Sequence, residues 1–71
     1  MTTLKQYRIR AHASLSEVAR QAGISPVTVG RAEEGKPIQE LKAIQLAEGL
    51  SKLLGKTIGV EDIEGLVVYK S

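Results

Sequence analysis

Three side chains within residues 27–31 combine an apolar group, a hydroxyl and a planar cation. Val27 and Thr28 are followed by Arg31, so that all three share one face of a helix that starts at Pro26. This combination suits base-pair edges, because valine contacts a thymine methyl, threonine donates or accepts, and arginine forks to guanine O6 and N7. Gly30 lets a backbone approach closely. The alternatives are a solvated or phosphate-bound Arg31 and a tolerated surface glycine.

Groups that bind phosphate flank this stretch on both sides. Ser14 and Ser25 each stand where a helix would begin, which directs the hydroxyl and the capped amides toward an anion. Pro26 follows at the first helical position, and Lys36 adds a cation just beyond the stretch. We expect these four residues to fix register on a DNA backbone rather than to read sequence.

The residue types needed for catalysis or metal binding are scarce. The chain has no cysteine, which removes disulfides, thiolate ligands and cysteine nucleophiles. The single histidine, His12, is expected to interact with free carbonyls at a helix end. Glu61, Asp62 and Glu64 form an acidic run typical of a helix start, and the GKT at 55–57 lacks the glycine spacing of a phosphate loop. We therefore predict no enzyme, no cofactor and no metal site.

Capping residues and glycines divide the first half of the chain into short helices. Capping boxes at residues 3–6 and 14–17 begin two helices, expected at 3–12 and 15–22. Gly23 fits the left-handed position that ends the second of these helices. A tight turn is therefore expected directly after residue 22.

A third helix is expected at 26–34, immediately after that turn. Ser25 supplies its N-cap, Val29 and Ala32 face inward, and Gly35 ends it. Two helices joined by so tight a turn form a helix-turn-helix, whose second helix is presented to a partner.

The second half of the chain predicts one long helix, one short helix and a tail. The long helix follows Pro37 and ends before Gly55. A short helix is expected at 60–64 with Ile63 turned inward. The C-terminal tail 66–71, which is apolar over 66–69, either caps the core, pairs with a twin strand in a dimer, or frays. The apolar residues that recur at helical spacing in the long helix are Leu41, Ile44, Ala47, Leu50 and Leu54.

The string LSEVARQAGISPVTVGRAEEGK at residues 15–36 resembles the helix-turn-helix of the Cro/C1 repressor-like (XRE) family of DNA-binding regulators. The likeness extends over about residues 3–66 and implies an all-α, compact five-helix, lambda-repressor-like domain. Its helix-turn-helix, at about 14–35, is formed by helices two and three, and the third helix lies in the major groove. The matching residues are Arg8, Ser14, Val18, Ala19, Gly23, Ile24, Ser25, Val29, Glu33, Gly35 and Lys36.

The resemblance also implies a partly buried ion pair and one departure from the family. Arg8 and Glu33 match the pair that links helix one to the end of helix three, and Glu33 lies on the inward face where a charge needs a partner. Losing one partner of a desolvated pair is expected to cost about 3–5 kcal/mol. Leu15 stands where the family commonly has a glutamine that bonds phosphate or base, so we expect it to pack instead.

Length and charge fit this interpretation. The 71 residues are enough for one small domain, 1–71, with a thin aliphatic core. Residues 1–36 hold six basic and three acidic side chains, whereas 37–71 hold four and five, so positive charge lies in the half that would face a polyanion. No apolar run approaches the length of a bilayer, and we expect no membrane association and a cytoplasmic protein.

We interpret the chain as a sequence-specific DNA-binding transcriptional regulator that binds double-stranded DNA as a homodimer on a palindromic operator. One reading helix buries about 600–1,000 Å², which rarely supplies high specificity alone. The alternatives are a protein-binding module, such as the antitoxin of a toxin–antitoxin pair or an adaptor with a protein partner, and a DNA-binding fragment of a longer regulator. Candidates for the dimer interface are Leu53, Ile58, Leu66, Val68 and Tyr69, with core packing as the alternative for the first two.

Overall fold

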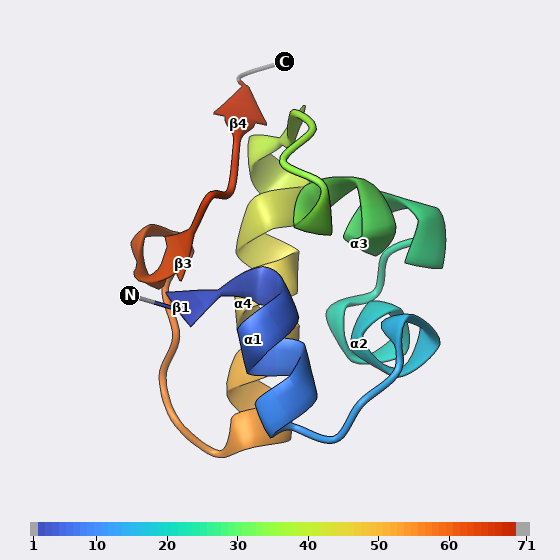
Figure 1. Cartoon of the computed structure of the whole chain (residues 1–71), viewed down its shortest axis with the longest axis vertical. Helices are drawn as coiled ribbons and strands as arrows, with labels where there is room; N and C mark the ends of the chain where they lie inside the picture. The colour runs from blue at the N-terminus through green and yellow to red at the C-terminus, as the bar shows by residue number, and fades with distance from the viewer. Residues whose placement is uncertain (1, 70–71) are drawn as a thin grey trace.

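Helix α4 (Glu40–Leu54) lies at the centre of the structure, and the other helices pack around it (Figure 1). The computed structural model describes residues 2–69. Helices α1 (Leu4–Arg10), α2 (Leu15–Ala22) and α3 (Pro26–Glu33) precede α4, and α2 packs against it most extensively. The remaining elements are the strands β1 (Thr2–Thr3), β2 (Ile38–Gln39), β3 (Ile63–Glu64) and β4 (Val68–Tyr69), and the 3₁₀ turn η1 (Val60–Asp62).

The predicted capping residues begin the first two helices. The Thr3 hydroxyl accepts from Gln6 N at 3.2 Å, while Thr3 N donates to Gln6 Oε1 at 2.9 Å, and together they form the capping box of α1. Helix α1 ends at Arg10 rather than at residue 12, because His12 adopts a left-handed conformation with φ of 55°. Ser14 then caps α2 through its hydroxyl, which accepts the backbone amide three residues later at 3.1 Å.

The turn between α2 and α3 follows the sequence prediction closely. Gly23 has φ of 74°, the left-handed conformation that glycine adopts without steric cost. Ile24 N donates to Ala19 O at 3.0 Å, which closes the end of α2 in a Schellman arrangement. The Ser25 hydroxyl accepts from Val27 N at 3.1 Å and caps α3. The predicted helix-turn-helix is therefore confirmed.

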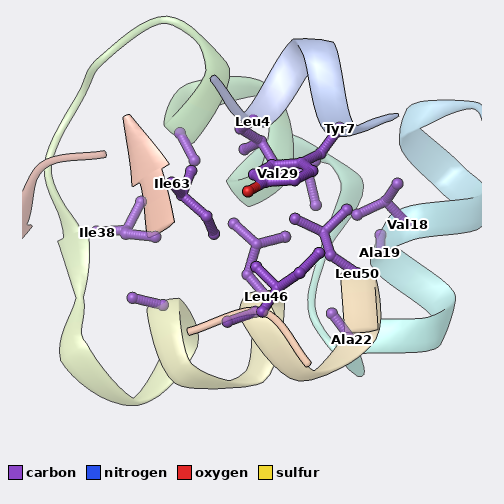
Figure 2. Close-up of a cluster of buried hydrophobic side chains, with 14 residues drawn as sticks. Leu4, Tyr7, Val18, Ala19, Ala22, Val29, Ile38, Leu46, Leu50 and Ile63 are labelled. Atoms are coloured by element: carbon purple, nitrogen blue, oxygen red, sulfur yellow. The ribbon is translucent and has the colours of Figure 1, made fainter. Parts of the chain in front are cut away.

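The hydrophobic core lies between α4 and the three preceding helices (Figure 2). Leu46 and Leu50 of α4 are fully buried, as are Val18 of α2 and Val29 of α3. Tyr7 of α1 is also buried, and its hydroxyl donates to a carbonyl of η1 at 3.3 Å. The core comprises Leu4, Tyr7, Val18, Ala19, Ala22, Val29, Ala32, Ile38, Ala43, Leu46, Ala47, Leu50, Ile58 and Ile63.

The close packing of α2 on α4 depends on a glycine. A Cβ added at Gly49 would lie 2.8 Å from Ala22 Cα and 2.8 Å from Ala22 N, which is nearer than unbonded atoms approach. Gly49 therefore sets the separation between α4 and the first helix of the helix-turn-helix.

The apolar stripe predicted for α4 is correct only in part. Ala47 and Leu50 are buried and Leu54 packs against the core, but Leu41 and Ile44 expose 65% and 44% of their surface. The helix carries two overlapping apolar stripes, and spacing alone does not distinguish them. Helix α2 packs on the stripe of α4 that contains the small residues, so Leu41 and Ile44 of the other stripe remain exposed to solvent. The buried residues of α4 are Ala43, Leu46, Ala47, Gly49 and Leu50.

The expected fifth helix is a single 3₁₀ turn. Gly59 N donates to Asp62 Oδ2 at 2.9 Å and caps the start of η1, which ends after three residues because Ile63 is extended. Ile63 then turns to an extended conformation and is buried, as predicted, but within β3, which pairs in parallel with β1. Residues 2–69 thus contain four α-helices rather than five, and short strands that an all-α prediction omits.

The apolar tail caps the core of its own chain. Strand β4 pairs in parallel with β2, with Ile38 opposite Val68, and Ile38 N donates to Val67 O at 3.0 Å. Leu66 and Val68 pack against the core. Of the three alternatives for the tail, the structure shows the first; residues 70–71 of the predicted tail 66–71 lie outside the described residues.

Most of the apolar candidates for a dimer interface are used within the chain. Ile58 belongs to the core with 5% exposure, and Leu53, Leu66 and Val68 are partly buried against it. Only Tyr69 among the candidates is well exposed, at 46%. Core packing therefore explains Leu53 and Ile58.

Candidate nucleic-acid interface

Helix α3 presents the three candidate reading side chains on its outer face. Val27 is 70% exposed, Arg31 is exposed and Thr28 is partly exposed, while Val29 and Ala32 on the opposite face are buried. The proline start and the Ser25 cap fix where the helix begins, and the burial of its inner face fixes its rotation. The inner face thus holds α3 against the core, and the outer face remains exposed to a partner.

A groove of about 730 Å³ lies beside this face and brings several predicted residues together. Gly30 contributes bare backbone, since a Cβ added there would meet nothing within 4 Å inside the chain. Leu15, which departs from the family pattern, both lines the groove and packs against the core. Lys36 lines the groove too, and its Nζ lies 3.4 Å from Glu34 Oε1. The lining residues are Lys5, Leu15, Val27, Gly30, Arg31, Glu33, Glu34 and Lys36.

Ser14 and Ser25 sit at the two helix starts of the helix-turn-helix. Each hydroxyl accepts a backbone amide, from Glu17 and Val27 respectively, and so retains its own proton for donation. Both residues are exposed, as is Pro26. The geometry leaves these hydroxyls and the positive ends of α2 and α3 available to an anion.

Arg8 and Glu33 join α1 to the end of α3. Arg8 Nε donates to Glu33 Oε2 at 2.5 Å, and Nη2 donates to Glu33 Oε1 at 3.3 Å. Arg8 Nη1 also donates to Ala13 O at 3.2 Å, which braces the segment that leads into α2. The side chains are only 19% and 11% exposed, and the hydrogen bond to Glu33 raises the pKa of Arg8 above its ordinary value. The pair therefore links three parts of the chain that orient α3.

A comparison with protein-family models matches residues 2–51 to a helix-turn-helix domain. The chain belongs to this helix-turn-helix domain family. The match spans α1 to α3 and most of α4, and it includes every predicted site residue. It is consistent with the resemblance to Cro/C1-type domains, and helix-turn-helix domains of this kind bind DNA. A search of curated proteins found no match, and neither did a search of solved structures.

His12 and the acidic run at residues 61–64 lie outside α3. His12 is exposed after α1, and Asp62 is engaged with the backbone of η1. No group of three or more histidine, cysteine or acidic residues within 2–69 is placed to hold a metal ion. No helix in the same range is long and apolar enough to cross a membrane.

Sequence reasoning missed one residue near α3. Lys42 at the start of α4 lines a second, smaller pocket together with Thr28 and Arg31. Tyr69, which the sequence suggested for a dimer interface, lines the same pocket. The pairing of β4 with β2 brings Tyr69 there, and no local pattern in the sequence indicates that pairing.

Proposed function

We propose that the protein is a sequence-specific DNA-binding transcriptional regulator whose residues 1–71 act as one helix-turn-helix domain that inserts α3 into the major groove. The observation that carries the proposal is the outer face of α3. This face joins an apolar, a hydroxyl and a guanidinium group on a helix that the core holds in place. The absence of cysteine supports a reducing compartment such as the cytoplasm.

In this proposal the reading and anchoring residues have separate roles. Arg31 forks to a guanine, while Val27 and Thr28 contact neighbouring bases. Ser14, Ser25, Pro26 and Lys36 fix the helix-turn-helix on the phosphates without reading sequence. A side chain at position 30 would stand between the backbone of α3 and the major groove of the DNA, and Gly30 has none.

We propose further that two copies bind a palindromic operator. A single reading helix covers too little DNA for high specificity, and a second copy doubles the contact. Leu41 and Ile44 support this step, because they lie one turn apart on α4 and form an exposed apolar face. Twofold pairing through this face would bury both side chains on each copy.

The test is selection of bound duplexes from a random library at about 0.15 M salt, where nonspecific charge contacts are weakened. We expect an enriched palindrome with half-sites about 10 bp apart. Arg31→Lys is the matched variant, since it keeps the positive charge and removes the pair of hydrogen bonds that a guanidinium donates to guanine. It should relax the preference at one base of each half-site while binding to random DNA persists.

A protein-binding module is the second candidate, and the exposed apolar face of Leu41 and Ile44 is the observation that favours it. This candidate predicts stable capture of one protein partner and no enriched DNA sequence. Enrichment of a palindrome that Arg31→Ala abolishes would exclude it in favour of the regulator.

A further inference from the structure

A pocket of about 160 Å³ lies between α3, the segment that leads into α4, and strand β4. Figure 1 shows β4 beside the first turn of α4, at the same end of the molecule as the segment leaving α3. The pocket is lined by Thr28, Arg31, Pro37, Ile38, Gln39, Lys42 and Tyr69.

The charged side chains that line this pocket are both basic. Arg31 and Lys42 both line it and no carboxylate does, whereas the groove on the other side of α3 includes Glu33 and Glu34. Gln39 is the N-cap of α4 but makes no side-chain capping bond, so amides of the first turn keep their capacity to donate. An anion is the occupant that these groups favour.

Strand β4 completes the polar side of the pocket. Its parallel pairing sets Tyr69 opposite Gln39, and the tyrosine stays 46% exposed rather than entering the core. Its phenol group adds a donor to the threonine hydroxyl and the two cations already present. Tyr69 lies beyond residues 2–51, so the match to the helix-turn-helix family does not include it.

The pocket adjoins the proposed reading face, because Thr28 and Arg31 belong to both. A helix in the major groove has a sugar-phosphate strand along each side. We propose that the pocket takes a phosphodiester group of the strand bordering the groove that α3 occupies, with Lys42 and Tyr69 as its contacts. The C-terminal strand is then part of the DNA interface, an inference that rests on the proposed function.

The experiment measures affinity for the selected duplex against salt concentration, by fluorescence anisotropy. Lys42→Ala should weaken binding about tenfold and lower the slope of log affinity against log salt by about 1, since one phosphate contact is lost. Tyr69→Phe should weaken binding about fivefold and leave the slope unchanged, because a neutral hydroxyl is removed.

Two control variants change side chains that do not line the pocket. Lys52→Ala removes an exposed lysine near the other end of α4, and Val67→Ala shortens an exposed tail side chain that does not line the pocket. Both should bind within twofold of the wild type. Thermal melts of all four variants verify that each remains folded.

Three results would overturn the inference. Wild-type affinity in both Lys42→Ala and Tyr69→Phe removes the pocket from the interface while leaving the proposed function intact. A millimolar response of Lys42 and Tyr69 resonances to inorganic phosphate, combined with unchanged DNA binding of the variants, assigns the pocket to a free phosphorylated molecule. Failure of the wild type to bind any duplex refutes the proposed function and the inference together.

Discussion

Replacement of Glu33 by alanine tests whether the ion pair with Arg8 holds α3 in position. In the unsubstituted protein the Arg8 side chain is 19% exposed. After the substitution, the hydrogen bond from Arg8 Nη1 to Ala13 O, at 3.2 Å, remains. The aliphatic part of the Arg8 side chain stays packed, but Nε and Nη2 lose the Glu33 carboxylate to which they donate. The cost of stranding those donors is the quantity to be measured.

The expected magnitude lies between two limits. Removing one partner of a fully buried pair costs about 3–5 kcal/mol, and exposed pairs contribute about 0.2–1 kcal/mol. With 19% and 11% exposure the pair is nearer the buried limit, and we expect about 2–3 kcal/mol. A domain of this length has a total stability of about 4–10 kcal/mol. The loss corresponds to a fall in Tm of about 10–20 °C.

The assay is thermal unfolding followed by circular dichroism. Glu17→Ala is the control, because Glu17 pairs with Arg20 at 3.4 Å on the surface, with side chains 39% and 72% exposed, and its loss should lower Tm by only about 1–4 °C. Arg8→Met combined with Glu33→Leu should be more stable than Glu33→Ala, because no charge is stranded. A Glu33→Ala protein that melts within about 3 °C of the wild type would refute the reasoning.

The pair also predicts how stability depends on pH. A folded-state pKa raised above the unfolded value gives stabilisation that is complete below the unfolded pKa and is lost as pH rises through the folded one. Arg8 is such a group, and an arginine titrates far above neutral pH. The difference in Tm between Glu33→Ala and the wild type should therefore stay constant from about pH 7 to about pH 10.

The remaining predictions concern glycines and the exposed face of α4. Gly49→Ala should destabilise by about 1–3 kcal/mol because the added Cβ meets the backbone of Ala22, and an unchanged melt would contradict this. Gly30→Ala should stabilise by about 0.5–1 kcal/mol, since the space is open, while weakening DNA binding severalfold; equal binding would show that the backbone does not approach the groove. Leu41→Glu with Ile44→Glu should abolish dimers in sedimentation without lowering Tm, and a wild type that sediments as a monomer even on its operator would rule out the dimer.

Local signals predicted the helix-turn-helix because its determinants are local. Thr3, Ser14 and Ser25 each cap a helix through an amide two or three residues away, and Gly23 needs only its own φ to end α2. The side chains facing outward from α3 follow from helical geometry once the start is fixed at Pro26. The face that carries the candidate site was therefore predictable from sequence.

Elements that depend on distant partners were not predictable in this way. Leu41 and Ile44 occupy a plausible apolar stripe, and only the packing of α2 at Gly49 decides that another stripe is buried. The 3₁₀ turn ends early because Ile63 is extended and pairs with Thr2 of β1, where helical spacing allowed a full helix. Tyr69 lines the same pocket as Lys42 because β4 pairs with β2, and no periodicity in a single segment encodes that contact.

The two parallel strand pairs are the shortest regular contacts of the fold. Strand β3 pairs with β1 at the start of the described chain, Thr2 opposite Ile63, and β4 pairs with β2, Ile38 opposite Val68, each over two residues. Such short pairs contain few backbone hydrogen bonds and lie at the edge of the fold, so we expect them to open more readily than the packed helices. The amide of Ile38, bonded to Val67 O, should therefore exchange with solvent sooner than the amide of Ile24 at the end of α2. Brief openings of the C-terminal segment would leave α3 folded while separating Tyr69 from Arg31 across the pocket that both line.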